Sequence, residues 1–140
     1  MQKIILDTCV FVSAILGQAG ASRAVLRACF EGRYQPLMGN ALFLEYEDLI
    51  TRDELFATCK LNSKERNILL DSFLSTCQWI TVYYSWRPNL RDEADNHLVE
   101  LAVAGNADYL VTKNRKDFQY PELHFNEFQV IDPITLLKEE

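Results

Sequence analysis

The sequence lacks any run of about eighteen apolar residues, the length that a transmembrane helix needs. Its opening segment, MQKIILDTCVF, has neither the basic region nor the small-residue cleavage site of a secretory signal. Its four cysteines are scattered singly, and no cysteine or histidine cluster has the spacing of zinc ligands. We therefore expect a soluble cytoplasmic protein with reduced thiols, without a membrane segment or structural zinc.

Positive charge is scarce as well, with 14 Lys and Arg against 20 Asp and Glu and a net charge of −6. This balance argues against a protein that coats nucleic acid, because phosphate binding normally requires an excess of Lys and Arg. It leaves room for an enzyme that acts on nucleic acid, since a local basic cluster with a bound metal can hold phosphates.

Several catalytic motifs are absent too. Neither the phosphate-binding loop G-x-x-x-x-G-K-[ST] nor the dinucleotide motif G-x-G-x-x-G occurs. His97 and His124 stand away from any Ser or Cys at the spacing of a nucleophile motif, so no catalytic triad is predicted. We interpret both histidines as surface or structural residues.

Short apolar runs that are typical of strands alternate with segments of helical periodicity. The chain has 140 residues, 49% of them hydrophobic, which matches the size of one domain. We predict a single domain over residues 1–140, a three-layer α/β/α sandwich with a mainly parallel central sheet. The expected strands are 3–6, 35–38, 79–84, 108–112 and 128–131. The expected helices are 10–16, 22–30, one to residue 50 that Asn40 caps, one to residue 76 that Asn62 and Glu65 cap, 92–104, and a closing turn at 134–138.

Four acidic residues occupy positions beside the expected apolar core, where carboxylates are unfavourable in a soluble domain. Asp7 ends the first strand, Glu45 and Asp95 lie on the apolar stripes of two helices, and Asp117 follows a later strand. Ligands of open α/β sheets collect outside the carboxyl ends of the strands. Carboxylates gathered there repel one another by on the order of 4 kcal/mol for each close pair, at an effective dielectric constant near 20. A divalent cation between them would relieve this repulsion.

Most of these acids can also have a structural role that does not involve a metal. Asp7 can cap the helix that follows it. Asp92 or Asp95 can complement the positive end of a helix, and Asp117 can be a solvated turn residue. Glu45, in the middle of its helix, has no such role.

Three segments carry a resemblance to a known family. The chain resembles a PIN domain, the metal-dependent nuclease fold of toxins in bacterial and archaeal toxin–antitoxin pairs, over essentially its whole length. The segments are IILDTCVFVSAIL, LFLEYEDLITR and RDEADNHLVELAVAGNADYLVTKNRKDF.

The resemblance implies that Asp7, Glu45 and Asp95 are metal ligands and catalytic residues, with Asp117 as a fourth acid. The acid on the helix expected at 92–104 can fall at Asp92, Asp95 or Asn96, and helical spacing favours Asp95. Supporting residues would be Thr8, Asp92, Asn96, Thr112 and Asn114, the last at a place where many relatives have aspartate.

The implied activity is hydrolysis of RNA phosphodiester bonds with Mg²⁺ or Mn²⁺, which prefer such oxygen ligands. Arg91, Lys113, Arg115 and Lys116 can hold the flanking phosphates, or belong to solvated turns. The resemblance also implies a small antitoxin partner and a homodimer. Two alternatives stay open: a PIN-like module that binds RNA or protein without cutting it, and a phosphoacceptor domain of flavodoxin-like shape.

Overall fold

Strands and helices alternate along the chain in the computed structural model, which describes residues 1–17, 20–82, 96–113 and 128–139. The strands are β1 (Gln2–Leu6), β2 (Tyr34–Met38), β3 (Gln78–Trp79), β4 (Tyr109–Val111) and β5 (Gln129–Ile131). The helices are α1 (Thr8–Leu16), α2 (Gly20–Phe30), α3 (Asn40–Ile50), α4 (Ser63–Thr76), α5 (Asn96–Gly105) and α6 (Pro133–Lys138), with a short 3₁₀ helix, η1 (Asp53–Phe56).

The strands form one parallel sheet in the order β3-β2-β1-β4-β5. Its centre is apolar on both faces, because Ile4, Ile5 and Leu110 of β1 and β4 are all 0% exposed. Such continuous apolar strands are typical of a parallel sheet that helices cover on both sides. The prediction of a mainly parallel sheet is confirmed.

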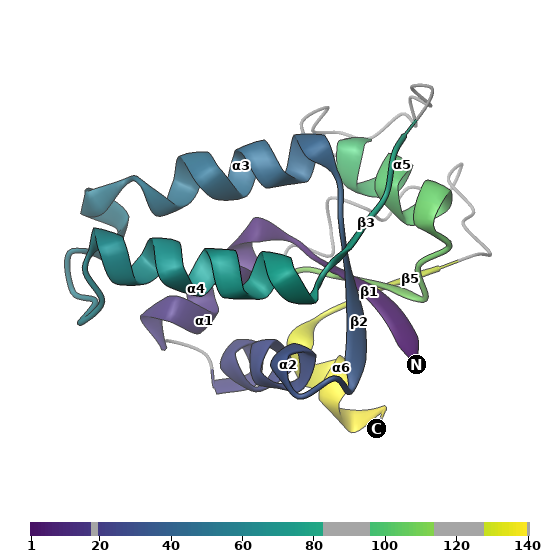
Figure 1. The fold of residues 1–140 in the computed structure, drawn as a ribbon. Coiled ribbons are helices and arrows are strands. Elements are labelled where there is room, and N and C mark those ends of the chain that lie inside the picture. The colour runs from purple at the N-terminus through teal and green to yellow at the C-terminus, as the bar shows by residue number, and fades with distance from the viewer. Residues whose placement is uncertain (18–19, 83–95, 114–127, 140) are drawn as a thin grey trace.

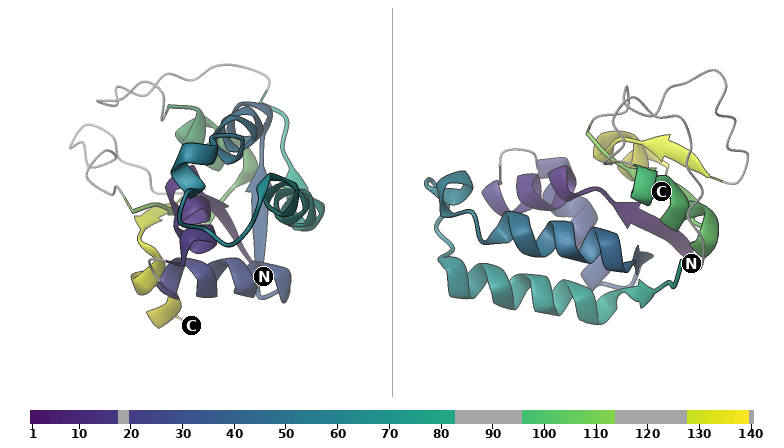
Figure 2. Two further views of the ribbon diagram at one scale, coloured as in Figure 1. Left: turned by 90° about the vertical axis from the view of Figure 1, so that its left-hand side faces the viewer. Right: turned by 90° about the horizontal axis from the view of Figure 1, so that it is seen from above.

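The helices form layers on either side of this sheet. Helices α3 and α5 lie on one side of it, and α2 and α6 lie on the other (Figures 1 and 2). Helix α1 follows β1 directly and contacts both α2 and α3, while α4 packs against α2, α3 and β2. This arrangement confirms the predicted three-layer α/β/α fold.

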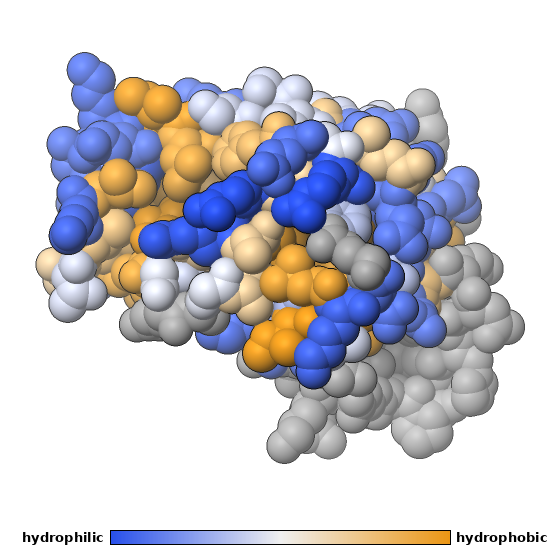
Figure 3. Space-filling view, turned by 90° about the horizontal axis from the view of Figure 1, so that it is seen from below, coloured by the Kyte–Doolittle hydropathy of each residue, from blue (hydrophilic) through white to orange (hydrophobic). Residues whose placement is uncertain are grey.

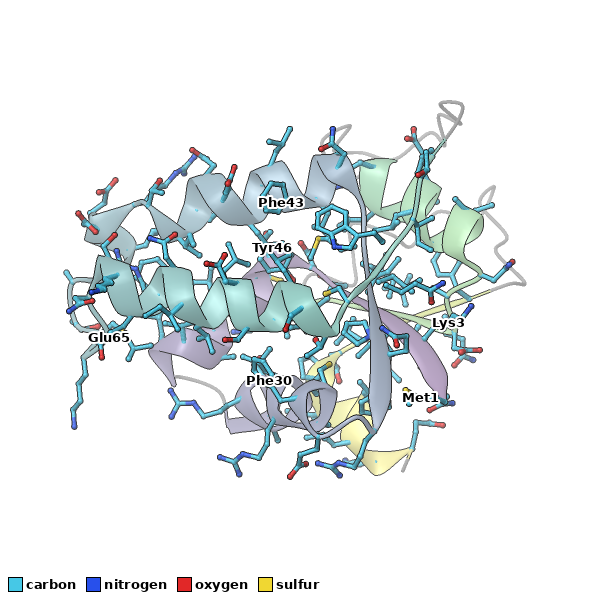
Figure 4. All side chains as sticks on the ribbon, viewed as in Figure 1. Met1, Lys3, Phe30, Phe43, Tyr46 and Glu65 are labelled. Carbon is cyan, nitrogen blue, oxygen red and sulfur yellow. The ribbon has the colours of Figure 1, made fainter. Side chains whose placement is uncertain are left out.

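An aromatic cluster joins three of the helices inside the molecule. The ring of Tyr46 on α3 lies 5.0 Å from that of Phe11 on α1 and 6.0 Å from that of Phe73 on α4. Figure 4 shows Tyr46 pointing from α3 into the space between α3 and α4. The cluster fixes where α3 lies relative to β1 and α1, which matters for the site described below.

The helix starts differ in part from the sequence-based expectation. Asn62 and Glu65 form the expected capping box of α4, with hydrogen bonds of 2.8 and 3.0 Å. The prediction that Asn40 caps α3 is wrong, since Asn40 is the first helical residue and Gly39 is the cap. A Cβ atom at position 39 would lie 3.1 Å from the side chain of Leu101 on α5. This close packing favours glycine, which has no side chain, at the cap.

Two other boundaries shift. Strand β3 spans two residues and pairs with Leu37 and Met38, so it begins earlier and is shorter than the predicted 79–84. Residues 83–84 of that prediction, and 92–95 of the predicted 92–104 helix, lie outside the described residues. The short helix η1 was not predicted.

In the described part of the chain, no single helix has the length and apolar composition to cross a membrane. Helices α1 and α2 together pass that test as a bent pair, by length and composition only. Their apolar residues Val10, Phe11, Val25 and Leu26 belong to the buried core.

Candidate active site

Two polar residues lie at the carboxyl ends of neighbouring strands. Asp7 follows β1 and Thr112 follows β4, and these strands pair so that Leu6 lies opposite Val111. The backbone N–H of Asp7 extends this pairing by donating to the carbonyl of Val111 at 2.9 Å. The Thr112 hydroxyl then donates to Asp7 Oδ2 at 2.8 Å. Strand register alone therefore brings together two side chains that are 105 positions apart.

The Asp7 carboxylate is buried, with the residue 6% exposed. Asp7 precedes α1 in the N-cap position, but its side chain makes no capping hydrogen bond. It accepts instead from Thr112 and, at 3.4 Å, from the hydroxyl of Thr8. Burial raises the pKa of Asp7, the bond from Thr112 lowers it, and the nearby charge of Glu45 raises it further. The ionised form of Asp7 is therefore costly without a positive charge nearby.

Glu45 reaches the same place from α3. Its Oε1 accepts from the Thr8 hydroxyl at 2.9 Å, so that one hydroxyl lies between the two carboxylates. Tyr46 positions the helix here, because its hydroxyl donates to the carbonyl of Leu6, next to Asp7, at 2.6 Å.

The buried stripe of α3 differs from the predicted one. Leu42, Tyr46 and Ile50 are its buried residues, whereas Ala41 is exposed. The Glu45 side chain, 34% exposed, thus lies on the flank of the helix between core and solvent, beside the apolar stripe on which it was predicted to lie.

His97 is the residue of this site that sequence reasoning missed. Its Nε2 lies 2.8 Å from Glu45 Oε2, and its side chain is 19% exposed. The hydrogen bond with His97 lowers the pKa of Glu45, burial raises it, and the bond from Thr8 lowers it, with a net decrease. The available signal was the position of His97 in the sequence, shortly after the acidic segment 92–95. Its contact with Glu45 could not be predicted from a local sequence pattern, because the two residues are 52 positions apart.

A groove of about 380 Å³ adjoins the carboxylates. Its lining comprises Thr8, Cys9, Val12, Ser13, Leu16, Leu49, Leu55 and Lys113. The Lys113 ammonium donates to the Ser13 hydroxyl at 3.1 Å, which places a positive charge in the groove. Burial and the charge of Asp7 raise the pKa of Cys9, so its thiol stays protonated and is a poor nucleophile.

The structure thus brings together part of the predicted site. Polar contacts connect Thr112 to Asp7, Asp7 to Thr8 and Thr8 to Glu45. Lys113 lines the adjoining groove. The other predicted residues lie outside the described part: Arg91, Asp92, Asp95, Asn114, Arg115, Lys116 and Asp117. Asn96 begins α5, but its side chain is not described.

The donor chemistry of the described residues fits a hard divalent cation. Asp7 and Glu45 offer only oxygen atoms, which suit Mg²⁺ and Mn²⁺. The repulsion that Glu45 exerts on Asp7 is the effect that such a cation would cancel. Within the described ranges no three His, Cys, Asp or Glu side chains gather as a metal site, so the described acids supply two ligands at most.

Comparisons with known proteins bear on the family and the fold. A sequence model of the PIN domain matches residues 3–116. VapBC2 from Rickettsia felis, solved bound to a DNA fragment from their promoter, contains a similar fold, with a TM-score of 0.63 and 18% identity over 94% of this chain and 98% of that chain. A search of curated proteins finds no significant match. Because the PIN model spans most of the sequence and the fold agrees, the chain belongs to the PIN-domain family.

Proposed function

We propose that this protein is a metal-dependent ribonuclease that hydrolyses RNA phosphodiester bonds, and that it is the toxin of a toxin–antitoxin pair. The observation that carries the proposal is the convergence of Asp7 and Glu45, from separate elements, at the carboxyl edge of a parallel sheet. Families with the PIN domain are generally nucleases, which supports a reaction of this class.

Asp7 and Glu45 would hold Mg²⁺ or Mn²⁺, together with Asp95 and Asp117 from the undescribed segments. When bound, such a cation neutralises charge on the scissile phosphate and lowers the pKa of a water molecule. The protein's own residues orient the acids. Thr112 holds Asp7, and the single proton of the Thr8 hydroxyl serves the shorter bond to Glu45.

The adjoining groove suits a segment of single-stranded RNA. Lys113 supplies a positive charge for a phosphate beside the carboxylates, and the apolar wall of Val12, Leu16 and Leu49 can contact a base. Local charge of this kind is needed because the chain carries −6 overall. Arg91, Arg115 and Lys116 would extend the phosphate contacts.

A partner protein has a second surface available. A groove of about 320 Å³ lies between α1, α2 and α4, lined by Arg23, Arg27, Phe30 and Leu69 among others. Figure 3 shows the face that carries α2, where apolar side chains lie among strongly hydrophilic ones. The similarity to VapBC2, a toxin–antitoxin complex, supports a small antitoxin as the partner. We expect its binding segment to combine apolar and acidic side chains.

One observation favours a second candidate, a PIN-like module that binds RNA or protein without cutting it. Asp7 Oδ2 and both oxygens of Glu45 already accept hydrogen bonds from side chains of the protein, and the described residues gather no third ligand. Asn114, at a position where relatives carry aspartate, adds no charge.

The deciding experiment is cleavage of end-labelled RNA by the purified protein with Mg²⁺, with Mn²⁺ and with EDTA. Cleavage should require the metal and fall at least about 100-fold in Asp7→Asn, as expected when a transition-state contact is lost. Asp71→Asn is the matched control, because Asp71 is exposed on α4. Cleavage that persists in EDTA, or in Asp7→Asn, contradicts the proposal. Metal binding without cleavage of any RNA favours the binding module.

A further inference from the structure

We propose that His97 is a positioning residue for Glu45, holding that carboxylate in the orientation in which it binds a divalent cation. This inference rests on the proposed function and extends it to a residue outside the acidic set.

The two oxygens of Glu45 have different partners. Thr8, on α1, donates to Oε1 at 2.9 Å, and His97, on α5, lies 2.8 Å from Oε2. Since an ionised carboxylate only accepts hydrogen bonds, Nε2 is the ring nitrogen that carries the proton. The carboxylate is therefore held from two sides by elements that are far apart in sequence, which fixes both its position and the direction of its plane.

Glu45 needs such support more than Asp7 does. Its side chain has three rotatable bonds and is 34% exposed, whereas Asp7 is short and 6% exposed. Ordering a glutamate side chain costs conformational entropy, because the side chain loses its freedom to change rotamer. A contact that orders Glu45 before the cation arrives removes this cost from binding.

His97 is itself fixed by its helix. The residues that follow it, Leu98 and Val99, are 0% exposed, so the start of α5 is anchored in the core. Its other ring nitrogen, Nδ1, is buried and has no hydrogen-bond partner among the described residues. Within that part of the chain, the polar contact of the imidazole is directed at Glu45 alone.

A purely structural role for His97, as a contact that holds α3 and α5 together, predicts different effects of substitution. Such a contact would contribute to the stability of the fold without affecting how Glu45 binds metal. Positioning requires an N–H donor at one particular place. In His97→Gln the amide nitrogen can lie near the position of Nε2, in His97→Asn it lies near that of Nδ1, and His97→Leu has no donor.

The test is Mn²⁺ binding to the full chain, measured by calorimetry, beside RNA cleavage. His97→Leu should weaken Mn²⁺ binding about 10–100-fold, the usual effect of losing a partner of a metal ligand. His97→Gln should recover most of this loss, and the matched variant His97→Asn should not. Equal binding by wild type and His97→Leu, or equal losses in the Gln and Asn variants, would overturn the inference. If His97→Leu fails to fold, the comparison of Gln with Asn decides.

A double variant separates this inference from the proposed function. Glu45→Gln alone should weaken Mn²⁺ binding, and adding His97→Leu should cause no further loss, because His97 acts through Glu45. Further weakening in the double variant contradicts positioning and leaves the metal site intact. If Glu45→Gln binds Mn²⁺ as well as wild type does, both the metal site and the role of His97 are wrong.

Discussion

Asp7 and Glu45 are neighbouring carboxylates whose surroundings move their pKa values in opposite directions. Asp7 is buried, and burial raises its pKa. Glu45 lies nearer to solvent and meets an imidazole N–H, which lowers its pKa. The two acids therefore contribute to stability with opposite dependence on pH.

Asp7→Asn should stabilise the metal-free protein at neutral pH. The pKa of Asp7 in the folded state lies above its ordinary value of 3.8, so ionised Asp7 favours unfolding, and its favourable contribution is lost as the pH rises through the folded pKa. The gain of the variant should thus be largest near pH 7 and shrink as the pH falls. Urea unfolding in EDTA between about pH 7 and pH 4 measures it. A variant less stable at every pH would mean that Asp7 is a structural residue.

Glu45→Gln should have the reverse effect. Because the folded pKa of Glu45 lies below its ordinary value of 4.5, its stabilising contribution is present above that value and is lost as the pH falls through the folded pKa. We expect a loss of about 0.5–1 kcal/mol at pH 7, kept small because a third of the side chain is solvent-screened. The same urea series should show the loss fading in acid. A loss that stays undiminished well below pH 4.5 contradicts the lowered pKa that the contact with His97 gives Glu45.

At the level of elements, one buried hydrogen bond links α3 directly to the end of β1. Tyr46 is 1% exposed, and its hydroxyl holds α3 against the end of β1, next to Asp7. Its ring packs against Phe11 and Phe73 and is retained when the hydroxyl is removed.

Tyr46→Phe should lower the free energy of unfolding by about 1–2 kcal/mol, because a buried hydrogen bond is lost without loss of packing. It should also reduce RNA cleavage, since Glu45 is the adjacent residue on α3. Asn62→Ala provides the control: loss of the α4 cap costs about 1 kcal/mol and should leave cleavage unchanged. Urea unfolding and the cleavage assay measure both variants. Equal cleavage by the two variants would contradict a role for Tyr46 in positioning the site.

The element that sequence patterns missed, η1, depends on a distant contact. Arg66 on α4 is 3% exposed; it donates to the carbonyl of Ile50 and forms an ion pair with Asp53 of η1 at 2.5 Å. Its guanidinium also lies 4.5 Å from the ring centroid of Phe56. A segment of four residues is too short for periodicity to reveal, and this one is held by a residue of the next helix.

For the whole molecule, the proposed metal site predicts that stability depends on the cation. A cation that binds only the folded state stabilises it by about 2.7 kcal/mol at a hundredfold excess over Kd. Mg²⁺ should therefore raise the melting temperature of the wild type, by about 3–5 °C for each kcal/mol at this chain length.

In Asp7→Asn, Mg²⁺ should raise the melting temperature by less than it does in the wild type. The variant should therefore be more stable than the wild type in EDTA, and equally or less stable in Mg²⁺. Calorimetry of wild type, Asp7→Asn and the exposed control Asp71→Asn, each with EDTA and with Mg²⁺, measures the effect. The same Mg²⁺ response in all three proteins would place the cation elsewhere.

Local patterns in the sequence determined most elements of the fold and several residues of the site. Alternation of strands and helices predicted a parallel sheet with helices on both faces, and the apolar run before Asp7 placed that acid at the end of a strand. These features depend on periods of about 2 and 3.6 residues, which near neighbours in the chain define. The prediction of a single domain over residues 1–140 stays a prediction.

Only the tertiary structure decided which side chains meet. The contact of Thr112 with Asp7 depends on β1 and β4 being paired, and that of His97 with Glu45 depends on α3 and α5 sharing one side of the sheet. Strand order and helix packing arise from the burial of all the apolar faces together, which no local window of sequence contains. For this reason Asp7 and Glu45 could be proposed as site residues from the sequence, whereas the contact of His97 with Glu45 became visible only in the folded chain.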